Sequence, residues 1–244
     1  MKTAKAWWLR LWRILSLKRI VYLGLILAGF CAVHFLVPTQ HVPWRSLQID
    51  KPLGAATKTQ LSRLDVASAK RCTSMIDQAQ YLKTVAAKPH QSGEKCGWEN
   101  GFTSTDMHGA VFSTRGVTMQ CPLTIGTYIW TREINRLAQK YFDTDLKTIH
   151  HAGTYSCRRQ KGNSSNAWSE HAFANAFDIM AFELADGQII SIKKDWNGEK
   201  KKRRFLHKVR NEACNIFRVT LSPDYNAAHA DHLHIDMGPA AICR

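Results

Sequence analysis

Residues 226–238 read NAAHADHLHIDMG and place three histidines, His229, His232 and His234, within six positions. Side chains two positions apart on a β-strand point to the same face, so a strand over DHLHIDM directs His232 and His234 to one side of a sheet. Histidine is the commonest metal ligand and the usual proton carrier near neutral pH. Taken alone, the stretch fits either a histidine-rich surface loop or one half of a metal site.

A second stretch, SEHAFANAFDIMAF at residues 169–182, supplies two further ligand types, His171 and Asp178. Seven positions on one helix would separate them by about 10.5 Å along the axis, and one strand would turn them to opposite faces. A turn through the small alanines between them would place His171 before a strand and Asp178 on it. Two histidines and one aspartate with an open fourth position form the pattern of a catalytic zinc site.

The remaining segments mix helices with neighbouring strands. We predict helices over residues 61–87, 121–142 and 199–217, where apolar residues recur at helical spacing. Short strands and turns are expected over 88–120, a strand over 146–159, and a β-hairpin over 177–194 around Asp186-Gly187. FRVTLS and DHLHIDM close the chain as strands. The order predicts an α+β fold, an antiparallel sheet with flanking helices that carries the zinc site.

The N-terminal segment predicts a membrane anchor. Six cationic and no acidic residues precede an uncharged run, IVYLGLILAGFCAVHFLV, at residues 20–37. Its eighteen residues just span a bilayer core, and the basic end is expected to stay in the cytoplasm. A cleaved signal peptide is the alternative, but the run is long and no A-x-A site follows it. We therefore predict a cytoplasmic basic N-terminus (1–19), a transmembrane helix (20–37), a tether (38–60) and one exported domain (61–244).

Cysteine usage agrees with export. One of the seven cysteines, Cys31, lies in the apolar run, and the other six follow it. An even number there predicts three disulfides in an oxidising compartment, although the sequence does not choose among the fifteen pairings. A cytosolic zinc ribbon would need close Cys-x-x-Cys pairs, and the chain has none. The six cysteines are Cys72, Cys96, Cys121, Cys157, Cys214 and Cys243.

The formal charge of +15 suggests nucleic acid as a partner until its distribution is considered. Part of it precedes the apolar run, and much of the rest lies in one stretch, KKDWNGEKKKRR at 193–204. Such a run is usually a solvated face. Because the domain is expected outside the cytoplasm, we predict no nucleic-acid partner and consider an anionic wall polymer or the membrane surface instead.

The H-x6-D pair followed by H-x-H resembles the zinc metallopeptidases that group lysostaphin-type enzymes, D-Ala-D-Ala metallopeptidases and the hedgehog domain. Within that group, TYSCR, SEHAFANAFDI and FLHKVRNEACNIFRVTLSPDYNAAHADHLHIDM resemble the bacterial extensin-like C-terminal domain family. The resemblance covers most of residues 70–244. The histidine three positions before H-x-H is also similar to one in penicillin-insensitive murein endopeptidases.

The resemblance implies roles for the candidate residues. It makes His171, Asp178 and His234 the zinc ligands, and His232 the general base or transition-state stabiliser. It implies that His229 lines the pocket and that Arg158, or its neighbour Arg159, orients the substrate. Four further residues are candidates for hydrogen bonds that orient the ligand side chains: Ser169, Glu170, Asp231 and Asp236.

The expected function is that of a periplasmic zinc peptidase, anchored by one helix in the inner membrane, that hydrolyses peptides of peptidoglycan. The alternative is a non-catalytic module that binds cell-wall polymer on the same zinc-binding fold.

Overall fold

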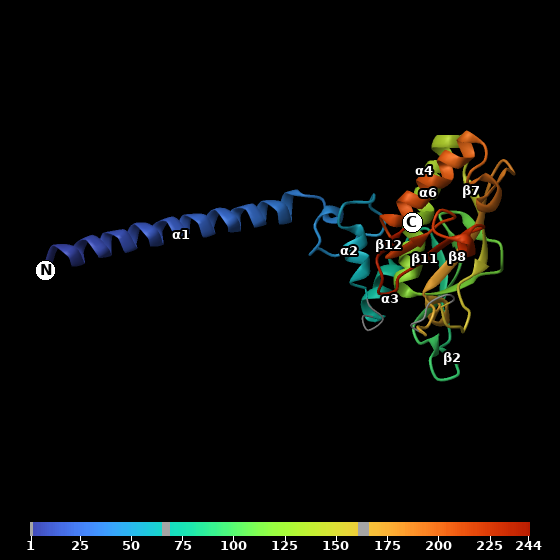
Figure 1. Ribbon diagram of the computed structural model, residues 1–244, viewed down its shortest axis with the longest axis horizontal. Helices are drawn as coiled ribbons and strands as arrows, with labels where there is room; N and C mark the ends of the chain where they lie inside the picture. Colours follow the sequence, from blue (N-terminus) through green and yellow to red (C-terminus); the bar gives the residue numbers. More distant parts are fainter. Residues whose placement is uncertain (1, 65–68, 161–165) are drawn as a thin grey trace.

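The computed structural model describes residues 2–64, 69–160 and 166–244, and Figure 1 shows a long N-terminal helix projecting from a folded domain. This helix, α1 (Lys2–Leu36), continues without a break from the basic segment into the apolar one. Its stretch Leu17–Leu36 has a mean hydropathy of 1.9, and none of it is buried. Its length and composition suit a membrane anchor or a signal sequence.

The segment after α1, expected to be a tether, folds back onto the domain. The side-chain amide of Gln60 donates to three backbone carbonyl groups of this segment, those of Thr39, Val42 and Arg45. The Tyr128 hydroxyl donates to Asp50 at 2.6 Å. Arg45 donates to the carbonyl of His34 near the end of α1, at 2.9 Å. Residues 38–60 therefore connect the apolar helix to the domain through specific contacts.

One large sheet forms the middle of the domain, in the order β1-β4-β5-β7-β8-β11-β10-β12, with β6 beside β4 and β9 beside β8. The strands are β1 (Leu82–Ala86), β4 (Gly101–Met107), β5 (Ala110–Phe112), β6 (Val117–Gln120), β7 (Leu146–Gly153), β8 (Ala176–Leu184), β9 (Ile189–Ser191), β10 (Val219–Leu221), β11 (Leu233–Asp236) and β12 (Ile242–Cys243). A separate hairpin pairs β2 (His90–Ser92) with β3 (Cys96–Trp98).

The α+β class is confirmed, but the expectation of an antiparallel sheet is wrong. The pairs β5–β7 and β10–β12 run parallel, so the sheet is mixed. Parallel neighbours need a long connection instead of a tight turn. Between β5 and β7 the chain passes through β6 and the whole of helix α4 (Cys121–Phe142), which reverses its direction. Alternating hydrophobicity predicts a strand but carries no information about the direction of its neighbour.

The helix predicted over residues 61–87 is also wrong in its last part. The structure contains α2 (Thr57–Ser62) and α3 (Ala69–Asp77), while residues 65–68 lie outside the described part of the chain. Residues 82–86 form β1, whose burial alternates along the strand and which pairs antiparallel with β4. The hydrogen-bonding edge of β4 thus outweighs the weak helical spacing of this segment.

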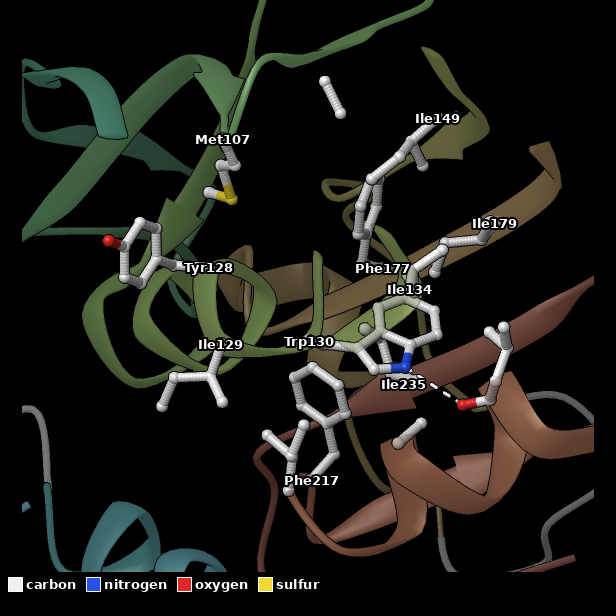
Figure 2. Close-up of a cluster of buried hydrophobic side chains, with 14 of the residues drawn as sticks. Met107, Tyr128, Ile129, Trp130, Ile134, Ile149, Phe177, Ile179, Phe217 and Ile235 are labelled. Atoms are coloured by element: carbon white, nitrogen blue, oxygen red, sulfur yellow. Dashed lines mark hydrogen bonds between the residues drawn. The ribbon is translucent and has the colours of Figure 1, made fainter. Parts of the chain in front are cut away.

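The core lies between the sheet and two helices, α4 and α6 (Lys200–Cys214), which lie side by side in Figure 1. Trp130 of α4 is fully buried and meets Phe217 edge-on, with ring centroids 5.7 Å apart (Figure 2). Its indole N–H donates to the Val209 carbonyl of α6 at 3.0 Å, so this large ring leaves no unpaired polar atom. The prediction of a helix over 121–142 is confirmed.

Three disulfides join the six cysteines of the domain, as predicted, and Cys31 is unpaired. The pairs are Cys72–Cys121, Cys96–Cys157 and Cys214–Cys243. The second pair has the most direct bearing on the site, because it joins the β2–β3 hairpin to the segment that leaves β7.

Candidate metal centre

His171 is placed by a short 3-10 helix, η3 (Glu170–Phe173), that directly precedes β8. Ser169 caps this helix, and its hydroxyl accepts from the backbone N–H of His171 at 3.3 Å. Ala174 then takes a left-handed conformation with φ of 52°. The small side chain there allows the sharp turn that leads from His171 into the strand that carries Asp178, as the spacing predicts.

The adjacent strands β8 and β11 place Asp178 directly opposite His234. Nδ1 of His234 lies 2.8 Å from one carboxylate oxygen of Asp178. Nε2 of His171 lies 3.1 Å from the other oxygen and 3.3 Å from Nδ1 of His234. All three donor atoms fall within 4.8 Å of one another, so the structure brings together the three residues expected to hold a metal.

The outer nitrogens of both imidazoles are engaged. Nδ1 of His171 lies 3.2 Å from the carbonyl oxygen of Thr154, and Nε2 of His234 lies 3.0 Å from a carboxylate oxygen of Asp236. The second oxygen of Asp236 accepts from the backbone N–H of Gly238 at 2.8 Å. Such partners fix ring orientation and leave one nitrogen of each ring free for an ion.

The donor set suits a divalent metal ion. Tetrahedral bonds of 2.0–2.1 Å imply about 3.3 Å between neighbouring ligand atoms; the two imidazole nitrogens lie 3.3 Å apart, and the carboxylate oxygens lie 3.1 and 2.8 Å from them. Nitrogen and carboxylate oxygen donors also suit other first-row divalent ions. The residues therefore form a possible metal-binding triad, and the geometry alone does not select the ion.

His232 lies beside this triad with its two nitrogens in different surroundings. Nδ1 is 2.9 Å from a carboxylate oxygen of Asp231, and Nε2 is 3.6 Å from an oxygen of Asp178. A carboxylate oxygen can only accept, so Asp231 accepts from Nδ1–H of His232, and Nε2 is the nitrogen that faces the triad. His232 directly precedes β11, and both it and His234 reach the same carboxylate oxygen of Asp178.

His229 completes the cluster from a short 3-10 helix, η4 (Ala227–His229). Its ring centroid lies 5.1 Å from that of His232 and 5.9 Å from that of His234. Nδ1 is held 2.7 Å from the side-chain oxygen of Asn226, and Tyr225 packs edge-on against the ring. The ring therefore lies beside the triad without joining it.

The surroundings shift the pKa values of Asp178, His234 and His229 in different directions. Burial opposes ionisation of Asp178, but hydrogen bonds from His171 and His234 outweigh it and hold the pKa of Asp178 well below its usual range. Burial likewise opposes protonation of His234, yet Asp178 and Asp236 outweigh it and raise its pKa to about 9. Burial, together with the charges of His232 and His234, lowers the pKa of His229 to about 4, so this ring is neutral at pH 7.

The two candidate arginines lie in different environments. Arg159 stacks on the indole of Trp168, with its guanidinium carbon 3.9 Å from the ring centroid, and donates to the Asn166 carbonyl. The charge of Arg158, in contrast, is among the causes that lower the pKa of His229, after burial and the neighbouring histidines. Of the two, Arg158 is therefore the one whose charge acts on His229.

The supporting residues divide between two positions. Ser169, Asp231 and Asp236 contact the backbone or rings of the cluster, as described above. Glu170 instead accepts from the side-chain amide of Asn175 at 2.6 Å, and burial raises its pKa. The Thr154 carbonyl is absent from the sequence-based candidates, because a backbone acceptor has no signature in side-chain types.

A family model described as "Extensin-like protein C-terminus" matches residues 70–244, which covers most of the chain. No curated protein and no solved structure matches the chain. All six candidate site residues lie inside the matched range.

Proposed function

The chain belongs to the extensin-like protein C-terminus family, and on this premise we propose that it is a membrane-anchored, zinc-dependent peptidase. Its substrates are peptide bonds in the stem or cross-link peptides of peptidoglycan. The proposal places this family beside the zinc metallopeptidases with H-x6-D and H-x-H motifs, on the resemblance of those motifs.

The observation that carries the proposal is the convergence of two imidazole nitrogens and a carboxylate within 4.8 Å, with both outer nitrogens already engaged. Three ligands leave the fourth position of a tetrahedral ion open, which is the arrangement of catalytic rather than structural zinc. When bound there, zinc would polarise the scissile carbonyl and lower the pKa of the attacking water.

The chain's own residues supply the proton transfer. His232 accepts a proton from the attacking water at Nε2. Asp231 accepts a hydrogen bond from the Nδ1–H of His232 and stabilises the imidazolium that forms. The same nitrogen then delivers the proton to the leaving amine. Arg158 supplies positive charge beside His229, where it would bind a substrate carboxylate or stabilise the developing oxyanion.

Location supports peptidoglycan as the substrate. In this proposal α1 is a single-pass inner-membrane anchor with its basic end in the cytoplasm, and the domain lies in the periplasm; the length and apolar composition of α1 support the anchor. Three disulfides agree with an oxidising compartment. A hydrolase held on that side of the membrane meets wall peptides and no nucleic acid.

The test measures metal content and muropeptide cleavage on one preparation of the full chain, purified in detergent after expression with export. We expect about one zinc per chain and cleavage by the wild type. His171→Ala should lose both, whereas His232→Ala should keep the metal and lose cleavage. His150→Ala is the matched control and should behave as the wild type. His150 lies on β7 and pairs with Glu183 of β8.

Zinc bound without cleavage of sacculi or muropeptides would contradict the peptidase and favour the polymer-binding module. Cleavage by His232→Ala at the wild-type rate would remove that residue from the mechanism.

A further inference from the structure

An exposed cationic surface lies outside the metal centre. Residues 193–204, here called the basic surface, contain seven cationic residues against two acidic ones. They span α5 (Ile192–Asp195), the following loop and the first turns of α6. Within the part of the chain that the structure describes, no ion pair engages any of these cations, and six of them are exposed: Lys193, Lys194, Lys200, Lys201, Arg203 and Arg204.

With the exception of Lys201, whose Nζ lies 4.9 Å from the centroid of the Phe142 ring of α4, these cations do not stabilise the helix that carries them. The first turn of α6 holds Lys200, Lys201 and Lys202 and no acidic residue, although the positive end of a helix dipole favours acids there. Lys200 also faces Arg203 and Arg204 at the i+3 and i+4 positions, where like charges repel. The helix is held by its other face, where Phe205, Leu206 and Val209 are buried. If this face were only solvated, a mixture of acidic and basic residues would stabilise the helix more than cations alone.

The basic surface points away from the membrane. Lys58 of α2 donates to the Cys214 carbonyl at 3.0 Å, which fixes the last turn of α6 beside the segment that follows α1. The first turn of α6 lies about 20 Å further along its axis. Figure 1 accordingly shows α1 on one side of the domain and the start of α6 toward the opposite side. The lipids around α1 are therefore out of its reach.

The basic surface also begins next to the metal centre. β9, which leads into it, pairs with β8, the strand that carries Asp178. A hydrogen bond from His232 lowers the pKa of Asp231, and the charge of Lys193 contributes to the same shift, which places Lys193 near the Asp231–His232 pair. The cations thus extend from the neighbourhood of the metal centre toward the end of the domain remote from α1.

We infer that the basic surface is a docking site for a wall polymer with closely spaced carboxylates, and that a strand bound along it leads to the metal centre. Peptidoglycan carries such carboxylates on its stem peptides. Docking itself does not depend on the proposed peptidase activity, because it uses side chains that take no part in the metal triad.

The experiment is co-sedimentation of the detergent-solubilised full chain with purified sacculi over a range of salt concentrations. A charge-reversal variant carries Lys200→Glu, Lys201→Glu, Arg203→Glu and Arg204→Glu. Its matched control reverses four exposed lysines elsewhere that form no ion pair among the described residues: Lys51, Lys70, Lys88 and Lys95. We expect wild-type binding to weaken with salt, the variant to lose at least tenfold in affinity, and the control to lose less than twofold.

Three further experiments keep the inference falsifiable. The variant should keep its metal and unfold at a temperature close to that of the wild type, because acids suit the start of α6, while the like-charge repulsion remains and the contact of Lys201 with Phe142 is lost; this excludes misfolding as the cause. His171→Ala should still bind sacculi, which separates docking from catalysis. Amidation of the sacculus carboxylates should abolish wild-type binding. Equal losses in variant and control, or binding that survives amidation and follows anionic lipid vesicles, would overturn the inference.

Discussion

The metal centre and the basic surface are neighbours, connected through the β8–β9 pair, but their charged side chains differ in whether they have partners. In the metal centre Asp178, His234 and Asp236 form a continuous chain of contacts between 2.8 and 3.0 Å. On the basic surface seven cations stand without an ion-pair partner among the described residues. A partnered cluster holds a small ion inside the protein, whereas an unpartnered one is free for a large partner outside it. The predictions below test this difference.

The largest effect is expected from removing the central carboxylate. Asp178→Ala deletes the ligand that both His171 and His234 contact, so metal affinity should fall by more than about 100-fold. Competition with a chromophoric chelator measures it. Asp106→Ala, which removes a carboxylate paired with the exposed Lys83, is the control and should not change affinity. An Asp178→Ala protein that binds zinc as the wild type does would show that the ion sits elsewhere.

A second large effect concerns pH. In the metal-free protein the pKa of His234 is raised from 6.5 to about 9, so its contribution to stability is fully present below pH 6.5 and is lost as pH rises through about 9. That shift corresponds to about 3 kcal/mol. A metal ion must displace the same proton, so the metal affinity should change in the opposite sense and rise about tenfold per pH unit from pH 7 to 9.

Calorimetry at pH 7 in two buffers of different ionisation enthalpy measures the proton released on zinc binding. We expect at least one proton per ion, and His150→Ala should give the same number. Zinc uptake without proton release would contradict the raised pKa of His234.

A smaller effect is expected from Asp236, which contacts a ligand side chain and not the metal ion. Asp236→Asn keeps the shape of the side chain but weakens the acceptor for Nε2 of His234. Metal affinity should fall by about 10- to 100-fold, less than for Asp178→Ala. The same chelator competition measures it. If Asp236→Asn equals Asp178→Ala in effect, Asp236 acts as a ligand and the triad is assigned incorrectly.

The smallest effect distinguishes the basic surface from the metal centre. Lys200→Glu replaces a cation by an acid at the start of α6 and should stabilise the fold by about 0.3–1 kcal/mol. Thermal unfolding measures it, and metal affinity should not change. Lys95→Glu, at an exposed lysine in the loop between β2 and β3, should have no effect on stability. A loss of stability in Lys200→Glu would mean that its charge has a partner in the fold.

Local patterns predicted the parts of the site that local geometry controls. The offset of two in H-x-H predicted that His232 and His234 share a face, and the alanines before Asp178 predicted a turn, which the left-handed Ala174 provides. Helical spacing and Pro122 gave the bounds of α4.

The sequence could not supply features set by distant contacts. The parallel pairing of β5 with β7 depends on where the chain re-enters the sheet after α4. The disulfide pairing depends on which segments lie close together in the fold. Only the fold shows that Arg159 stacks on Trp168, whereas the charge of Arg158 acts on His229. β1 was missed because the free edge of β4, and not its own sequence, makes it a strand.

The contacts of residues 38–60 have a consequence for how the protein meets its targets. A domain on a flexible tether samples a half-sphere above the bilayer, and the length of the tether sets its radius. Here the Gln60 amide and the Arg45 guanidinium fix the chain close to the end of α1. If α1 spans the membrane as proposed, the metal centre stays at nearly constant height above the bilayer and its search for targets becomes two-dimensional. Targets must then come within one thin layer parallel to the bilayer.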